Sequence, residues 1–93
     1  MVRPEVRLGQ VVVSRAGRDQ GEVYAVVGRA GEGFVLVADG LRRKLEKPKR
    51  KNLRHLLITP RVITEVEEKL TKGIRLNNAE LRRRLNEAGQ EGG

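Results

Sequence analysis

Residues 10–38 read QVVVSRAGRDQGEVYAVVGRAGEGFVLVA, and this stretch decides the fold. It consists of valine-rich runs separated by glycine-containing connections. The runs Gln10–Ser14, Glu22–Val27 and Phe34–Ala38 each have the length and the β-branched content of a strand. Gly31-Glu32-Gly33 supplies a tight connection between the second and third runs, because glycine adopts turn conformations without strain. The stretch therefore predicts three consecutive strands.

Two further strands are predicted in the residues that follow. Asp39-Gly40 is a strong hairpin signal, so we expect a fourth strand over Leu41–Leu45 directly after it. A fifth strand is predicted over Leu53–Ile58. Five strands within fewer than sixty residues favour a small barrel or a sharply curled sheet.

The pattern changes to helix after residue 58. Thr59-Pro60 has the signature of a helix start, with Thr as N-cap and Pro in the first helical position. Gly73 is expected to end this helix. The expected apolar face of the helix consists of Val62, Ile63, Val66 and Leu70.

A second short helix is predicted from Asn77, which serves as N-cap with Glu80 completing a capping box. Leu76 is placed to pack against Leu81. Gly89 is expected at the end of this helix, before a frayed tail over 90–93. The expected apolar stripe of this helix consists of Leu81, Leu85 and Ala88. We therefore expect a mainly β fold, with a β domain over residues 1–58 and a helical extension over 59–93.

Positive charge is concentrated in one segment. The chain carries 20 Lys and Arg against 12 Asp and Glu, a net charge of +8. Residues 42–55 hold eight basic groups and one acidic group, a net charge of +7, whereas residues 1–41 net 0 and residues 56–93 net +1. Cations this dense repel one another unless a polyanion screens them, so the segment predicts phosphate binding. The alternative is a solvated loop kept basic for solubility, although dispersed charge would serve that purpose equally well.

The candidate contacts for a polyanion lie in this segment and in the loop over residues 14–23. Pro48 keeps the middle of the segment extended. The two loop glycines either let the backbone approach a ligand closely or only shape the turn. The candidate residues are Arg15, Gly17, Arg18, Gly21, Arg42, Arg43, Lys44, Lys47, Lys49, Arg50, Lys51, Arg54 and His55.

Residues 11–27, VVVSRAGRDQGEVYAVV, resemble the KOW motif, in which a strand, a glycine-bearing loop and a second strand open an SH3-like barrel. The likeness covers roughly residues 8–58. Residues 35–40, with the basic residues after them, are similar to a strand and turn of KOW-bearing large-subunit ribosomal proteins. The stretch PKRKNL, residues 48–53, is similar to one in short bacterial KOW domain-containing RNA-binding proteins. Family members often carry a lysine where this chain has Gln20, so no basic contact is assigned there.

The resemblance implies a five-stranded SH3-like barrel that binds structured RNA. Ribosomal RNA is the expected partner, with ribosomal proteins as neighbours and translation as the process. KOW domains also occur in transcription elongation factors, where they contact protein as well as nucleic acid. A protein-interaction module that docks through a barrel edge or through the apolar faces of the C-terminal helices is therefore the competing hypothesis. DNA binding is a third, because phosphate contacts alone do not distinguish the two nucleic acids.

Residues that support catalysis or metal binding are scarce. Ser14 is the only serine and His55 the only histidine, and there is no cysteine. These residues cannot build a recognisable nucleophile set or metal site, so we expect no enzyme activity, no cofactor, no metal and no small-molecule substrate. The lack of cysteine fits a reducing compartment, and the cytoplasm is expected. No apolar run approaches the ~20 residues of a membrane helix, and residues 1–5 lack the apolar stretch of a signal peptide, so neither membrane insertion nor export is expected.

The aromatic residues indicate how RNA would be recognised. Only Tyr24 and Phe34 are present, and both fall in strand patterns where core packing is expected. Recognition through phosphates and shape is therefore favoured over base stacking. Arg82-Arg83-Arg84 either extends the RNA-binding surface or forms a solvated helix face.

Overall fold

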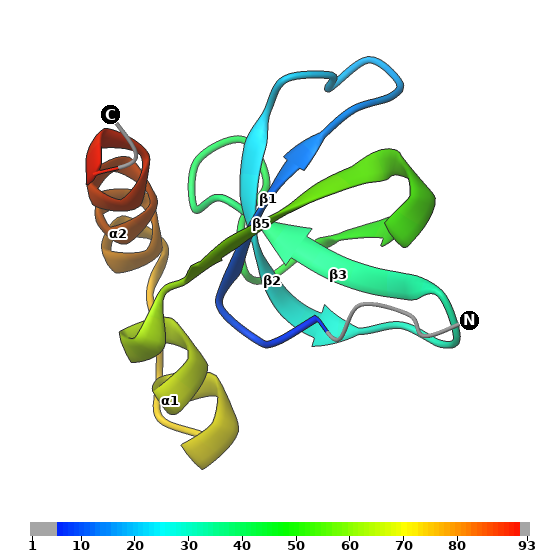
Figure 1. The fold of residues 1–93 in the computed structure, drawn as a ribbon. Helices are drawn as coiled ribbons and strands as arrows, with labels where there is room; N and C mark the ends of the chain where they lie inside the picture. The colour runs from blue at the N-terminus through cyan, green and yellow to red at the C-terminus, as the bar shows by residue number, and fades with distance from the viewer. Residues whose placement is uncertain (1–5, 92–93) are drawn as a thin grey trace.

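The computed structural model describes residues 6–91, which form a five-stranded antiparallel sheet followed by two α-helices (Figure 1). Three of the predicted strands are confirmed within a few residues. The strands are β1 (Gln10–Ser14), β2 (Val23–Arg29), β3 (Phe34–Ala38), β4 (Lys49–Asn52) and β5 (Leu56–Val62). The 3-10 turn η1 (Leu53–His55) joins β4 to β5, and the helices are α1 (Thr64–Lys72) and α2 (Asn78–Glu91).

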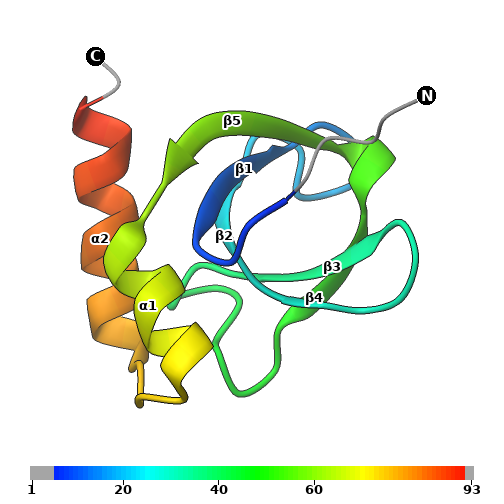
Figure 2. The ribbon, with the colours of Figure 1, turned by 60° about the horizontal axis from the view of Figure 1, so that its bottom comes forward.

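The strand order in the sheet is β4-β3-β2-β1-β5. The two edge strands, β4 and β5, are therefore consecutive in sequence, with only the three residues of η1 between them. A link this short can join opposite edges only if the sheet curls, and Figure 2 shows β5 arching over the other strands. Because no ladder pairs β4 with β5 among the described residues, the sheet is curled but not closed.

Apolar residues fill both faces of the curled sheet. Successive side chains on a strand point to opposite faces. Val12 accordingly faces the inside of the curl with Val26 and Val37, whereas Val11 faces outward beneath the helices with Ala25. The helices complete this outer layer with Val66, Leu81, Leu85 and Ala88. Both helices therefore pack on the sheet, as Figure 1 shows.

The prediction of a fourth strand over Leu41–Leu45 is wrong. The buried carboxylate of Asp39 accepts hydrogen bonds from the backbone N–H of Leu41 (2.9 Å) and of Arg43 (2.8 Å). These bonds wrap the chain around the Asp39 side chain, so residues 41–45 form a turn. Strand β4 begins only at Lys49, directly after Pro48.

The prediction of a helix start at Thr59-Pro60 is also wrong, because both residues lie in β5. The Thr59 hydroxyl donates to the Val11 carbonyl at 2.7 Å, and the Gln10 amide donates to the Thr59 carbonyl at 2.9 Å. Proline is tolerated here because β5 is an edge strand. Helix α1 begins at Thr64 instead, after Ile63, whose side chain is buried.

The other helix signals are largely confirmed. Gly73 ends α1 in the left-handed conformation, with φ of 72°. The Asn77 side chain caps α2 by accepting from the Glu80 N–H at 2.8 Å. The prediction that Glu80 completes a capping box is wrong, because its carboxylate instead accepts from the Lys69 ammonium at 2.6 Å, which ties α2 to α1. Helix α2 does not stop at Gly89 but runs to Glu91, and the rest of the predicted tail lies outside the described residues.

Candidate nucleic-acid interface

The β1–β2 loop is shaped by its glycines. Gly17 and Gly21 have positive φ values of 86° and 92°, a region that favours glycine. The Gly21 N–H donates to the Ser14 carbonyl at 2.7 Å, and the Gln20 N–H donates to the Gly17 carbonyl. The glycines therefore fold the loop back on itself and leave Arg15 and Arg18 exposed on its surface.

The Asp19 carboxylate fixes this loop to β4. It accepts hydrogen bonds from the Ser14 hydroxyl and the Tyr24 hydroxyl, each at 2.8 Å. It also accepts from the ammonium groups of Lys49 at 3.1 Å and Lys51 at 3.2 Å. Two cations of the basic segment are thus held beneath the loop.

The contacts around Asp19 shift the pKa values of both Asp19 and Tyr24. Burial acts to raise the pKa of Asp19, but the hydrogen bonds from Tyr24, Ser14 and the two lysines outweigh it, so this pKa lies well below its ordinary value. Burial, followed by the hydrogen bond to the Asp19 carboxylate, raises the pKa of the Tyr24 phenol well above its ordinary value. Asp19 is therefore a carboxylate and Tyr24 a neutral donor at neutral pH.

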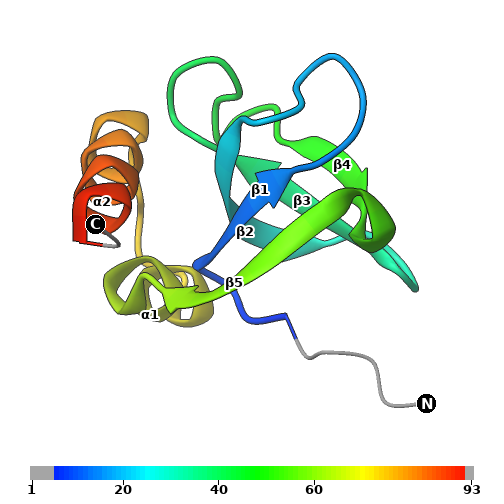
Figure 3. The same cartoon turned by 45° about the horizontal axis from the view of Figure 1, so that its top comes forward.

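A second tether joins the β1–β2 loop to the loop between β3 and β4. The Arg42 guanidinium pairs with the Glu22 carboxylate at 2.9 Å. Figure 3 shows both loops projecting from the same side of the molecule, with the β3–β4 loop beside α2. The Arg15 N–H donates to the His55 carbonyl at 2.9 Å, which brings η1 to the base of the β1–β2 loop. The structure thus brings together the two segments in which the sequence placed the candidate contacts.

Five candidate cations are accessible in this region. They are exposed, and their side chains form no ion pair, hydrogen bond or ring contact with any residue of the described chain. These residues, which we call the free cations, are Arg15, Arg18, Lys44, Lys47 and Arg54. They come from the β1–β2 loop, the β3–β4 loop and η1. His55 is also exposed beside Arg54.

Other candidates have roles inside the protein. The Lys51 side chain is only 8% exposed and donates to Ser14 as well as to Asp19, so its charge is already neutralised. Arg50 points to the other face of β4, where its guanidinium lies 3.8 Å from the centre of the Phe34 ring. The carbonyl of half-buried Arg43 accepts from the Asp39 and Gly40 N–H groups. The charge offered to a ligand is therefore smaller than the sequence count suggests.

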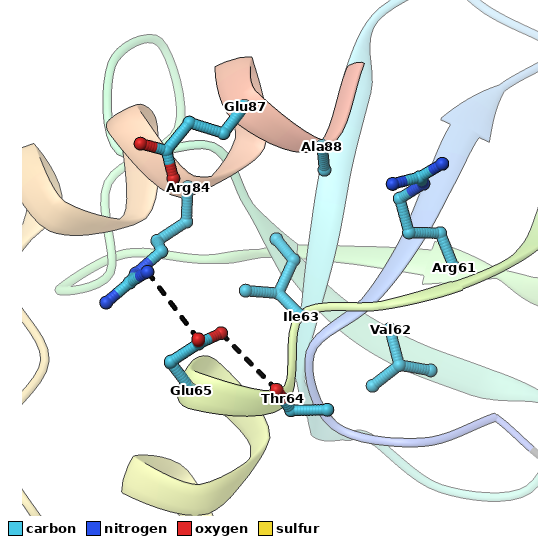
Figure 4. Close-up of a pocket in the computed structure, with 8 residues that line it drawn as sticks. All are labelled: Arg61, Val62, Ile63, Thr64, Glu65, Arg84, Glu87 and Ala88. Atoms are coloured by element: carbon cyan, nitrogen blue, oxygen red, sulfur yellow. Dashed lines mark hydrogen bonds and ion pairs between the residues drawn. The ribbon is translucent and has the colours of Figure 1, made fainter. Parts of the chain in front are cut away.

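The arginine run on α2 is divided between two directions. Figure 4 shows Arg84 turned toward Glu65 of α1, at 3.7 Å, in a hollow of about 240 Å³ between the helices. Arg84 also lies 3.8 Å from Glu80, so it joins the two helices. Arg82 and Arg83 instead border the β3–β4 loop.

Two acidic residues that the sequence interpretation left out organise the site. Asp19 and Glu22 make the contacts that position both loops. The sequence offered one signal for Asp19: it lies between two loop glycines, and a lysine-rich strand follows later in the chain. Sequence spacing alone could not show which lysines would reach it.

No protein-family model matches the chain, and no curated protein matches it. Within the described residues, no group of three or more Asp, Glu or His side chains is arranged to hold a metal ion. None of the helices in that part of the chain has the length and apolar character to span a membrane.

Proposed function

We propose that this protein is a non-enzymatic, cytoplasmic RNA-binding protein whose curled sheet is an SH3-like barrel of the KOW type. Its ligand is structured RNA, with ribosomal RNA as the expected partner. The exposed loops bind RNA phosphates through the free cations. No reaction is part of this proposal.

The observation that carries the proposal is that Asp19 fixes the β1–β2 loop to β4 and that the Glu22–Arg42 pair joins this loop to the β3–β4 loop. These contacts hold Arg15 and Arg18 on the same side of the molecule as the β3–β4 loop. A loop backbone that is fixed in advance loses little conformational freedom when a phosphate binds to its arginines, so less of the binding energy is offset by the entropy cost of ordering the loop. A purely solubilising role would not require them to be gathered.

The strand–loop–strand unit supports the KOW assignment. Strands β1 and β2 pair with Val12 opposite Tyr24, and the glycine-bearing loop between them is the segment whose sequence resembles the motif. The short η1 link between the edge strands supports an SH3-like curl. Tyr24 is buried as expected, whereas Phe34 is only half-buried and lies against the Arg50 guanidinium instead of in the core. With one ring buried and the other in contact with a guanidinium, phosphate recognition is favoured over base stacking.

The competing protein-interaction hypothesis relied on Leu81 and Leu85 of α2. Both are buried against the sheet, with exposed fractions of 0% and 4%. A partner could reach them only if α2 left the sheet, so the structure favours the loop surface. DNA binding remains an alternative outcome of the binding test.

The test is fluorescence anisotropy with a labelled, folded ribosomal RNA fragment and the Arg15→Gln/Arg18→Gln variant. Both arginines are free cations, so the fold should be retained. Loss of two phosphate contacts should lower the slope of log affinity against log salt by about 1.5 to 2. Affinity should fall for all folded RNAs alike, because phosphate contacts carry no sequence information.

The matched control is Arg29→Gln/Lys72→Gln, which removes the same charge elsewhere. Arg29 ends β2 at the opposite end of that strand from the β1–β2 loop, and Lys72 lies in the last turn of α1. A wild-type protein that does not bind folded RNA at low salt would overturn the proposal. Equal losses of affinity in the two double variants would show that the β1–β2 loop does not contact RNA. Tighter binding to duplex DNA than to folded RNA would favour the DNA alternative.

A further inference from the structure

Two hollows lie along α2, one on each side of a shared row of side chains. Arg82 and Asn86, one helical turn apart, line both of them. The first hollow, about 400 Å³, is bounded by Gly21 and Glu22 at the end of the β1–β2 loop and by Val23 at the start of β2. The second, about 720 Å³, is bounded by Gly40, Leu41 and Lys44 of the β3–β4 loop. Together they form a groove between α2 and the two cationic loops, which we call the α2 groove.

The wall of the α2 groove is held in place by contacts between the loop and the helix. The Asn78 side chain accepts from the Leu45 N–H at 2.8 Å and donates to the Glu46 carboxylate at 2.7 Å. Gly40 has no side chain, and this absence lets the loop backbone reach the Asn78 carbonyl. The groove is thus formed before any ligand arrives.

The groove has the chemistry of a site for a ribose–phosphate chain. Lys44 and Arg83 are exposed and form no ion pair with a described residue. The Arg82 side chain is 42% exposed, and its guanidinium is only loosely paired, at 4.0 Å from the Asp39 carboxylate. The Asn86 amide adds a neutral donor. Two acidic residues also line the groove: Glu22 is paired with Arg42, and Glu87, at the second hollow, is outnumbered by Lys44, Arg82 and Arg83.

An apolar side chain lies beside these cations. Leu41 is 56% exposed at the rim of the second hollow, which Ala79 of α2 also lines. Such a side chain suits contact with a sugar or a base, whereas an acidic peptide would not require it.

We propose that the α2 groove binds a backbone segment of the same RNA that contacts the loops, so that α2 is part of the RNA-binding surface. This inference rests on the proposed function and adds Arg82, Arg83 and Asn86 to it. Arg84 is not included, because it is turned toward Glu65.

The test compares Arg82→Gln/Arg83→Gln with the charge-matched Arg29→Gln/Lys72→Gln control. With folded RNA at 150 mM salt, the groove variant should lose affinity by about 10-fold to 30-fold and the salt slope should fall by about 2. The control variant should lose RNA affinity by no more than about threefold, because it only lowers the net positive charge of the protein. Arg83→Gln alone, which breaks no contact among the described residues, should give about half of the slope change.

A second measurement locates the contact directly. In NMR titrations with the same RNA, the backbone amides of Gly40, Lys44 and Asn86 should shift together with those of Arg15 and Arg18. Equal losses in the groove variant and the control, with unchanged amides along α2, would overturn the inference while leaving loop binding intact. Binding of polyglutamate to wild type that Arg82→Gln/Arg83→Gln abolishes, with RNA affinity no lower in that variant than in the control, would assign the groove to an acidic protein and also overturn it. If wild type binds no RNA, both proposals fail.

Discussion

A single carboxylate, that of Asp19, links the loop chemistry to the sheet. It receives two hydroxyl donors and two ammonium groups from three separate parts of the chain. A buried charge is stable only when it is paired and hydrogen-bonded, and the Lys51 ammonium depends on this partner. Asp19 therefore matters for stability more than for ligand contact.

Replacing Asp19 by Asn should lower the free energy of unfolding by about 3 kcal/mol, because it leaves the buried Lys51 ammonium without its counter-charge. Urea denaturation at pH 7 measures the loss. Glu68→Gln, which breaks an exposed ion pair with Lys72, is the control and should change stability by less than about 0.5 kcal/mol. A loss as small as that of the control would show that Lys51 is neutralised by other means.

The same comparison has a defined pH dependence. The pKa of Asp19 is lowered by folding, so the unfolded chain binds more protons at acidic pH and the stabilisation requires the ionised carboxylate. The difference between wild type and Asp19→Asn should be constant above about pH 5 and shrink as the pH falls below about 4, where the unfolded carboxyl is protonated. A difference that grows on acidification would contradict the assignment.

For single residues, the sequence predicted which residue types would form the candidate site but not which side chains would pair with one another. The prediction placed Lys49, Arg50 and Lys51 together in a phosphate-binding group. The alternation of a strand sends Arg50 to Phe34 and the two lysines to Asp19. Because the fourth strand was expected over Leu41–Leu45 and β4 is in fact Lys49–Asn52, the sequence could not assign these three side chains to the two faces of the strand.

Among the elements, the docking of α2 on the β3–β4 loop depends on Gly40. Its φ is +80°, and a Cβ there would overlap the Asn78 carbonyl and crowd the Arg82 N–H. Backbone contact of this kind leaves no flexible side chain to move aside. The position of the helix is therefore set by a residue in a loop.

Gly40→Ala should destabilise the protein by about 2 to 4 kcal/mol, through both the positive φ and the overlap with α2. Gly31→Ala is the matched control, because Gly31 has φ of +97° but no neighbouring atom within 4 Å. It should cost only about 1 kcal/mol. The difference in unfolding free energy between the two variants isolates the contact with α2, and equal losses would show that the helix adjusts.

The elements with repeating patterns were predicted well. Strands β1, β2 and β3 and the buried stripe of α2 follow from valine and leucine spacing. The errors fall where one side chain overrides the local pattern. The Asp39 carboxylate turned an expected strand into a loop, and the Thr59 hydroxyl kept an expected helix start in β5.

For the molecule as a whole, the free cations give a quantitative expectation. If about five phosphates are contacted, affinity for folded RNA should fall by ~10² to 10³ between 50 and 200 mM salt. Anisotropy titrations at four or more salt concentrations measure the slope. An affinity independent of salt would contradict an interface built on phosphate contacts.

The chain-wide charge predicted the kind of ligand but overstated the available charge. Of the eight basic residues in 42–55, Arg42, Lys49 and Lys51 are paired and Arg50 lies over a ring. The contribution of Arg82 and Arg83 depends on the turn at Asp39 that brings the loop to α2. No local pattern encodes that contact, because the two segments are about forty residues apart.

The three-residue link between β4 and β5 also bears on self-association. An open sheet has two edges whose unpaired backbone groups can recruit strands from another copy. Here the three residues of η1 connect the two edge strands, β4 and β5. Neither edge strand can straighten to pair with another copy unless the sheet uncurls. The curl thereby protects the edges of this valine-rich sheet against edge-to-edge aggregation.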